Sequence, residues 1–244
     1  MSRPRVRLER ARKKTSDVWV FDGEQAHHIL NVRRRSAGDI IEGLWDGRIF
    51  LLRLEMEDGN LIGVATGEGK FVVKNNLWLL VALLKADAFE RTLRMATESG
   101  AEKIVPLICE RSVVRIDPEK WQVKRKRWTK IIEESTKQSG VAECPLLYEP
   151  VCIDSIPSLP LPASRYAAML EEGSGYIVDC SPTGGAVLAI GPEGDWTSKE
   201  KERLLSAGFR AVSLGSRIMT SPTAAAVGLG CLSMKLEKFN EAKS

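Results

Sequence analysis

The sequence predicts an α/β protein in which a small all-β barrel domain, residues 1–72, precedes a larger domain, residues 73–244, that contains a mostly parallel sheet. Two observations predict this division. Short apolar or β-branched runs separated by Gly and Asp fill residues 18–65, as in small β domains. After residue 75, longer apolar runs alternate with segments of helical periodicity, which is typical of a sheet with helices on both faces.

The first domain is expected to contain four strands and one short helix. The strands are predicted at residues 18–21, 39–44, 48–54 and 61–65, and the helix at residues 24–32. Asp46-Gly47 separates two of these strands and predicts a hairpin, because a tight primed turn requires residues with positive φ.

The second domain is expected to alternate strands with helices. Residues 77–84 form an unbroken apolar run, which predicts a strand buried on both faces of a parallel sheet. Further strands are predicted at 103–108, 186–190 and 210–214. Two helices are predicted before residue 140: one contains Phe89 and ends at Gly100, and the other covers 120–138. Two more follow: one begins at the Thr197–Glu200 capping box and ends at Gly208, and the last covers 223–239. The proline-rich residues 156–162 predict a surface connection.

Composition excludes several classes of protein. The 244 residues are 43% hydrophobic and 28% charged, as in an ordinary globular chain. No run reaches the roughly 18 apolar residues of a membrane helix, and the basic N-terminus lacks the apolar core of a signal peptide. The five cysteines are odd in number and contain no C-x-x-C pair, so we expect reduced thiols in a cytoplasmic protein, with no metal site.

Positive charge is clustered, although the net charge is only +4. Residues 1–14 contain seven Lys or Arg and one acid, residues 33–35 are three arginines, and residues 120–130 contain six Lys or Arg and no acid. Such clusters are expected where a protein binds a phosphate backbone. A solvated helix face or a flexible tail is the alternative for each cluster.

Chemistry is expected in the two loops that follow the strands at 186–190 and 210–214, because ligands bind at the carboxyl ends of parallel strands. The first loop, residues 191–196, contains two glycines that allow a close approach of the backbone to a ligand. It matches neither a P-loop nor a dinucleotide fingerprint. The second loop combines Arg217 with hydroxyl side chains before an alanine-rich helix. A tight turn and a Thr-capped helix are the respective structural alternatives.

These residues carry a family resemblance. Residues 188–194, then 214–218, then Thr223-Ala224 resemble the paired C-terminal signatures of the bacterial 16S rRNA (uracil-N3)-methyltransferases of the SPOUT superfamily. Residues 101–107, 110–112, 127–131 and 137–140 are similar to further blocks of that family. Residues 28–33, with Gly38-Asp39 and Asp46-Gly47, resemble its PUA-like RNA-binding domain.

The resemblance implies a cytoplasmic homodimer with a trefoil-knotted C-terminal domain. Its expected activity is transfer of a methyl group from S-adenosylmethionine to N3 of a uridine in 16S rRNA of the small ribosomal subunit. Methyl-donor binding is assigned by the same resemblance to Leu188, Ile190, Gly191, Glu193, Gly194, Leu214, Gly215, Ile218 and Thr223.

Arg217 is the candidate catalytic residue, because a guanidinium can stabilise the developing uracilate or hold a phosphate. Its alternative is an ordinary ion pair. RNA contacts are expected from Arg33, Arg34, Arg35 and Lys85.

A second function remains open at this point. Thr220 and Pro222 stand where the family carries an arginine and a glutamate, Asp195 replaces a second glycine, and Val141 replaces an arginine. A non-catalytic RNA-binding or ribosome-assembly protein on the same fold, or a methyltransferase for a different RNA site, is therefore the alternative.

Overall fold

The computed structural model describes residues 3–46, 48–67, 69–71, 74–112, 114, 118–139, 141, 143–169, 171 and 173–241. The chain divides into two compact units, Met1–Val72 and Val73–Ser244. Gly47 and Gly140, which belong to the hairpin signal and to one of the family blocks, lie outside the described residues.

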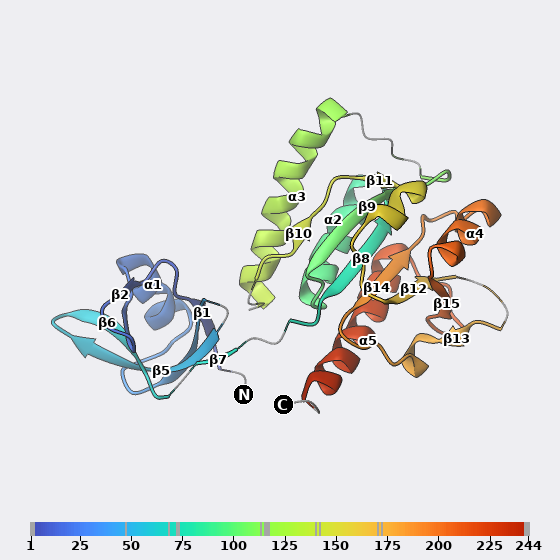
Figure 1. Ribbon diagram of the computed structural model, residues 1–244. Helices are drawn as coiled ribbons and strands as arrows, with labels where there is room; N and C mark the ends of the chain where they lie inside the picture. The colour runs from blue at the N-terminus through green and yellow to red at the C-terminus, as the bar shows by residue number, and fades with distance from the viewer. Residues whose placement is uncertain are drawn as a thin grey trace. The chain divides into compact units, whose positions relative to one another are not determined.

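The first unit is a curled, mixed sheet with a small core (Figure 1). Its strands are β1 (Arg5–Arg7), β2 (Arg12–Lys13), β3 (Val18–Val20), β4 (Ile40–Trp45), β5 (Arg48–Glu57), β6 (Asn60–Ala65) and β7 (Lys70–Phe71). The strand order is β1-β4-β5-β6-β3-β2, with β7 paired to β5. Trp19, Ile41, Leu52 and Leu54 are buried in the core. The predicted small β domain is thus confirmed, as a curled half-barrel whose strand order begins at β1 and ends at β2.

The predicted helix of the first unit is split into two types. Helix α1 (Gly23–His27) begins at Asp22, whose carboxylate accepts a hydrogen bond from the Gln25 backbone at 2.7 Å. It continues as a π-helical turn, His28–Val32. A π-helical turn is rare and often marks a functional segment, and this one leads directly into the three arginines at 33–35.

The second unit contains an eight-stranded parallel sheet in the order β10-β9-β8-β14-β12-β15-β13, with β11 also paired to β9. The strands are β8 (Leu77–Ala82), β9 (Lys103–Ile108), β10 (Leu146–Leu147), β11 (Val151–Cys152), β12 (Ser164–Ala168), β13 (Gly175–Tyr176), β14 (Ala186–Ile190) and β15 (Arg210–Ser213). Every residue of β8 and β14 is buried, as their unbroken apolar runs predict.

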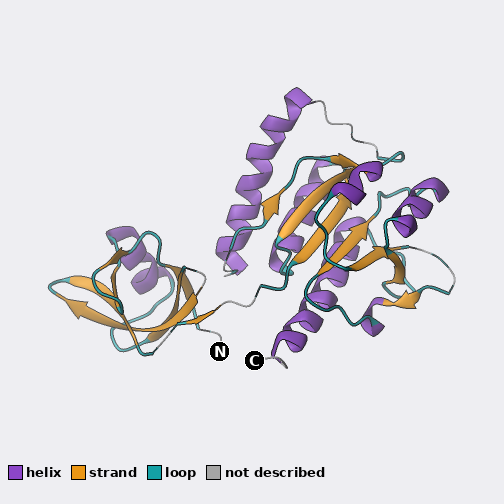
Figure 2. Ribbon diagram, in the orientation of Figure 1, coloured by secondary structure: helices purple, strands orange, loops and turns teal. Residues whose placement is uncertain are grey.

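Helices flank this sheet (Figure 2). They are α2 (Ala86–Glu98), α3 (Pro118–Ser139), α4 (Ser198–Ser206) and α5 (Ser221–Glu241), with 3₁₀ turns η2 (Ile153–Ser158) and η3 (Ile177–Asp179). Helix α2 packs against both α3 and α5, whereas α4 packs against η2. The predicted surface connection at 156–162 is only partly at the surface, because it begins inside η2 with a fully buried Ile156.

Strand β12 lies in the interior of the sheet, beside its central strand β14, and was not expected from the sequence. It pairs in parallel with β14 on one side and β15 on the other. The connection from β12 to β14 then passes the outer edge of β15, where it pairs as β13. Its η3 turn contacts α5, the helix that follows β15. This connection therefore contacts both β15 and α5, the two elements that complete the chain after it.

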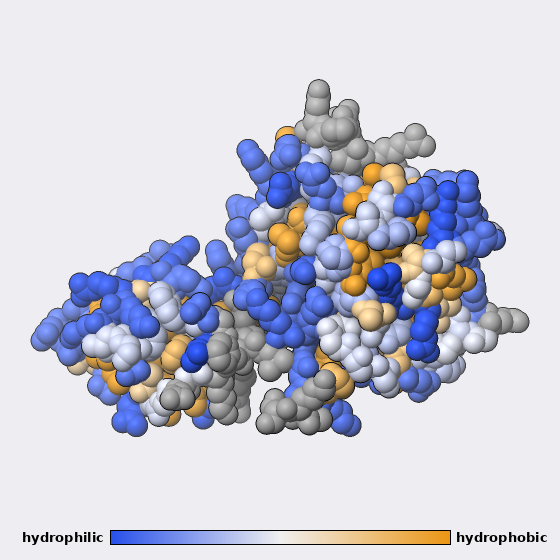
Figure 3. Space-filling model, in the orientation of Figure 1, coloured by the Kyte–Doolittle hydropathy of each residue, from blue (hydrophilic) through white to orange (hydrophobic). Residues whose placement is uncertain are grey.

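Hydrophilic residues cover most of the face shown in Figure 3. Within the part of the chain that the structure describes, no helix is both long enough and apolar enough to cross a membrane.

Small residues allow α5 to lie close to the sheet. A Cβ atom at Gly228 would stand 2.5 Å from Cδ2 of Leu188, a fully buried side chain of β14. A Cβ atom at Gly230 would meet nothing within 4 Å. The two glycines of one helix therefore differ in whether a side chain fits.

Gly228→Ala should destabilise the second unit by about 1–2 kcal/mol, because overpacking against Leu188 outweighs the better helix propensity of Ala. Urea unfolding measures this change. Gly230→Ala is the matched control and should not lower the free energy of unfolding. Equal effects of the two substitutions would contradict the close packing described for Gly228.

Candidate functional site

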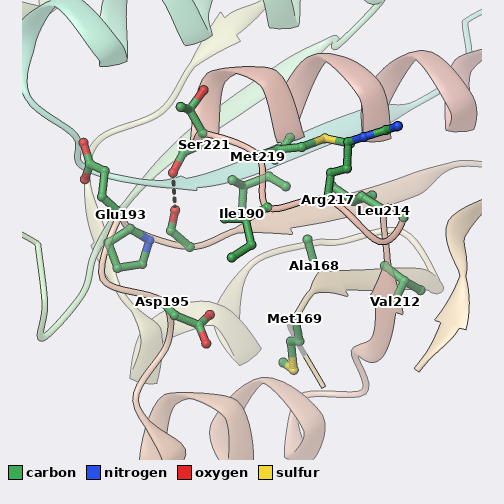
Figure 4. A pocket seen from close by; sticks show the side chains of 16 residues that line it. Ala168, Met169, Ile190, Glu193, Asp195, Val212, Leu214, Arg217, Met219 and Ser221 are labelled. Carbon is green, nitrogen blue, oxygen red and sulfur yellow. Dashed lines mark hydrogen bonds between the residues drawn. The ribbon is translucent and has the colours of Figure 1, made fainter. Parts of the chain in front are cut away.

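A cavity of about 340 Å³ opens at the carboxyl ends of three neighbouring parallel strands, β14, β12 and β15 (Figure 4). Residues singled out in the sequence that line it are Ile190, Gly191, Glu193, Leu214, Gly215, Arg217 and Ile218. Lining residues that sequence reasoning did not assign to the site are Ala168, Met169, Pro192, Asp195, Val212, Met219, Thr220, Ser221 and Ala224. The two loops predicted to carry chemistry thus face one cavity.

Three of the singled-out residues lie beside the cavity instead of lining it. Leu188 is fully buried in β14, where it packs against α5 at Gly228. The Gly194 carbonyl accepts a hydrogen bond from the Arg111 guanidinium at 2.7 Å. The Thr223 hydroxyl is hydrogen-bonded to the Thr220 hydroxyl at 3.0 Å.

The first loop is shaped by the indole of Trp196. This side chain is buried, and its Nε1 donates a hydrogen bond to the Ala168 carbonyl of β12 at 3.0 Å. A Cβ atom at Gly191 would lie only 3.0 Å from the indole ring. Glycine is therefore the residue that lets the loop backbone cross the indole without displacing it.

Charged side chains brace the far end of the same loop. The Lys201 ammonium lies 3.3 Å from the Asp195 carboxylate and 3.4 Å from that of Glu171. Partial burial lowers the pKa of Lys201, but the two carboxylates outweigh this effect and raise it. Glu200 completes the capping box with Thr197 and also accepts a hydrogen bond from the Glu110 backbone at 2.8 Å. Helix α4 is thereby fixed against the loop after β9.

The second loop is tied to the first by Ser221, whose hydroxyl donates to the Gly191 carbonyl at 2.9 Å (Figure 4). Gly215 adopts φ +122°, and a Cβ atom there would project into open space. Ile218 is 86% exposed although it is apolar and lines the cavity. An exposed apolar side chain beside a glycine with open space in front of it provides a surface that a ligand can cover.

Arg217 and two carboxylates lie on different walls. Glu193 and Asp195 come from the first loop, and Arg217 comes from the second, across the cavity from them (Figure 4). Arg217 is exposed and forms no ion pair within the described part of the chain. The ion-pair alternative for this residue therefore finds no support. The wall with the carboxylates can therefore bind a cationic group of a ligand, and the wall with Arg217 can bind an anionic group.

The basic residues expected to bind RNA occupy exposed or half-buried positions. Arg33 and Arg34 are exposed, and the Arg33 Nε donates to His28 Nε2 at 3.2 Å. Arg35 is half-buried, and its Nε has no hydrogen-bond partner among the described residues. Lys85 is exposed in the second unit, directly before α2 and after β8.

A metal site is not part of this arrangement. Among the residues whose placement is described, no group of three His, Cys, Asp or Glu side chains is arranged to hold a metal ion. The cavity instead combines apolar walls with the backbone groups of two glycine-containing loops, a combination suited to a small organic ligand with an aromatic part.

Comparison with known sequences places the second unit in a family. A family model described as an RNA methyltransferase domain matches residues 73–233. Ribosomal RNA small subunit methyltransferase E of Bacillus subtilis is 29% identical over 97% of this chain and 98% of its own length. The protein of the same name from Mycobacterium bovis is 27% identical over 94% of this chain and 91% of its own length.

Solved structures share the fold over nearly the whole chain. A probable rRNA-methyltransferase from Porphyromonas gingivalis is 26% identical, with a TM-score of 0.68 over 97% of this chain and 99% of that one. A ribosomal RNA small subunit methyltransferase E from Neisseria gonorrhoeae, bound to S-adenosyl methionine, is 23% identical, with a TM-score of 0.68 over 96% and 98%.

The buried thiol of Cys109, directly after β9, is predicted to be unreactive. Burial raises the pKa of Cys109 to about 12, with a further contribution from the Glu200 carboxylate. The thiol is therefore protonated throughout the range from pH 7 to 9, and it cannot act as a nucleophile there. Alkylation with iodoacetamide at pH 8, mapped by mass spectrometry, should modify the exposed Cys144 and Cys152 and leave Cys109 unmodified. Rapid modification of Cys109 in the native protein would contradict the burial of this thiol.

Proposed function

Because this chain belongs to the family of RNA methyltransferase domains, we propose that it transfers a methyl group from S-adenosylmethionine to N3 of a uridine in the 16S rRNA of the small ribosomal subunit. The observation that carries this proposal is the cavity at the ends of β14, β12 and β15, with its two glycine loops and Arg217 on one wall. The activity is cytoplasmic, where the ribosomal RNA lies.

The cavity fits the methyl donor in both shape and chemistry. Ile190, Leu214 and Ile218 provide apolar surface for an adenine ring, and the open space before Gly215 leaves room for the backbone to contact it. Glu193 places negative charge on the wall opposite Arg217, which favours the cationic donor, whereas the Asp195 carboxylate is paired with Lys201. When bound, S-adenosylmethionine supplies an electrophilic methyl group.

The remaining predicted donor-binding residues act through the residues that line the cavity. Leu188 is part of β14 and packs this strand against Gly228 of α5. Gly194 is held by Arg111, and Thr223 is held by Thr220 at the start of α5. Their contribution is to the position of the two loops, so their loss weakens donor binding indirectly.

Arg217 is the residue proposed to act on the nucleotide. Uridine N3 must lose its proton for the nitrogen to attack a methyl group, which leaves negative charge spread onto the ring oxygens. A guanidinium presents a planar fork of donors to such oxygens and stays protonated at any physiological pH. No nucleophilic side chain is required for this attack.

Contacts to the RNA outside the cavity are proposed for Arg33, Arg34, Arg35 and Lys85. The three arginines follow the π-helical turn of the first unit, and Lys85 lies at the carboxyl edge of the sheet that also carries the cavity. Phosphate contacts of this kind fix the register of the RNA without reading its sequence. The first unit thus acts as the RNA-binding domain.

A homodimer is proposed from the apolar surface of α5. Val227 and Met234 lie two helical turns apart on this helix and are 42% and 66% exposed. Val178 of η3, which contacts α5, is 59% exposed. Gathered apolar side chains of this kind are typical of a surface that another subunit covers.

The test of the proposed activity is methyl transfer from labelled S-adenosylmethionine to 16S rRNA transcribed in vitro and to assembled small subunits, with the modified base mapped. Incorporation at uridine N3 supports the proposal. Incorporation at another position would assign a different RNA site. RNA binding without incorporation into either substrate would favour the non-catalytic alternative, in which Thr220 and Pro222 have replaced reactive groups.

Arg217→Ala should lower kcat by about 100-fold, because it removes a donor to charge that develops in the transition state. The affinity for S-adenosylmethionine, measured by calorimetry, should change little. Arg217→Lys is the matched variant and should recover only part of the rate, since a single ammonium lacks the planar fork. A normal rate for the alanine variant would remove Arg217 from the mechanism.

Val227→Glu combined with Met234→Glu should give a monomer, because it places charge in the proposed subunit contact. Sedimentation equilibrium measures the mass directly, and circular dichroism confirms that the helix is retained. Leu205→Glu alters an equally exposed apolar residue on α4 and should leave the mass unchanged. A dimer that persists in the double variant would place the interface elsewhere.

A further inference from the structure

We propose that the N-terminal half of α3 forms a second RNA-binding surface of this unit, which holds the sugar-phosphate backbone of the RNA that flanks the target nucleotide. The surface, called here the α3 basic face, consists of Arg125, Lys126 and Lys130 together with Arg91 and Arg94 of α2. This inference rests on the proposed function, because it takes the substrate to be RNA.

Positive charge is distributed unevenly along α3. Residues 120–130 contain six Lys or Arg and no acid, and the first acids that follow are Glu133 and Glu134. Arg125, Lys126 and Lys130 are exposed. Positive charge is therefore concentrated between residues 120 and 130, and acids stand on both sides of this run, at Glu119 before it and at Glu133 and Glu134 after it.

Packing fixes which basic residues remain available to a partner. Trp121 and Trp128 are buried, and the ring of Trp128 packs on Phe89 of α2 with centroids 4.3 Å apart. Lys124 lies over Trp128, 5.6 Å from its centroid. Arg127 is paired with Glu90 of α2 at 2.7 Å. These contacts hold α3 in place, so that its opposite side faces solvent.

Lys126 and Lys130 are one turn apart on that solvent side. Four residues of an α-helix rise about 6 Å, which is comparable with the separation of adjacent phosphates along a strand. On the neighbouring helix, Arg91 and Arg94 are also exposed. The two helices pack together, so their exposed basic side chains come from neighbouring elements.

The topology places this surface at the same edge of the sheet as the cavity. Helix α3 follows the carboxyl end of β9, and the strand after it, β10, pairs with the beginning of β9. Its N-terminal half therefore lies toward the carboxyl edge, where the cavity opens (Figure 1). Lys85 follows β8 and Arg111 follows β9, so both lie at this carboxyl edge. In the strand order, β8 and β9 stand between β14, which carries the cavity, and β10, the strand that follows α3.

A phosphate backbone is the partner that this arrangement fits. The basic residues are exposed and long, and Val123 is the one large apolar residue of this part of α3 that is exposed among the described residues, which is less than the apolar centre that a protein partner requires. Each Lys or Arg that neutralises a phosphate releases counterions, so a row of them contributes affinity that depends strongly on salt and little on sequence. A strand held along this row would approach the cavity past Arg111 and Lys85.

The test compares the double variant Lys126→Gln/Lys130→Gln with the unmodified protein in binding to 16S rRNA transcribed in vitro, over a range of salt concentrations. Loss of two phosphate contacts should lower the slope of log affinity against log salt by about 1.4–1.8. The KM for RNA should rise by about tenfold at low salt, whereas kcat and the affinity for S-adenosylmethionine should not change.

The matched control is Lys199→Gln/Lys238→Gln, which removes the same charge from exposed positions of α4 and α5. It should keep the slope and the KM of the unmodified protein. Equal slopes for the two double variants would overturn the proposal. Because binding is measured apart from turnover, a protein that binds RNA without methylating it would contradict the proposed activity and still test the α3 basic face.

Discussion

The structure of the site depends on the parallel pairing of β12 between β14 and β15. This pairing brings the carboxyl ends of three strands together, so that the loops after β14 and β15 face each other across a single cavity. The hydrogen bonds that hold the loops follow from it: Trp196 can reach the Ala168 carbonyl, and Ser221 can reach that of Gly191, only in this register. A sheet with the same strands in another order would separate the loops.

Most of the fold could be predicted wherever a segment carries its own signal. Strands β8 and β14 are unbroken apolar runs, and α4 has a capping box, so each was found from local sequence. Strand β12 was missed because Ser164 and Arg165 open it and no β-branched residue follows. Its burial comes from its two neighbours, and the passage of the next connection around β15 is likewise decided by distant pairings.

The residues of the candidate site likewise fall into those that local sequence identifies and those that only the strand order brings to the cavity. The glycines and Arg217 stand out in the sequence because residues of these types, at the ends of strands, allow close approach and anion binding. Ala168, Met169 and Val212 carry no such signal, and they reach the cavity only because of the order of the strands. The basic run of α3 is evident from composition, but its position at the edge of the sheet that carries the cavity follows from topology alone.

The most direct test of this account is calorimetric titration of the full chain with S-adenosylmethionine, beside a variant in which Ala168→Phe fills the cavity from β12. The account predicts one binding site per chain in the unmodified protein and a large loss of affinity in the variant, with its unfolding transition preserved. Undiminished binding to a folded Ala168→Phe variant, or no binding to the unmodified chain, would contradict the assignment of this cavity to the methyl donor.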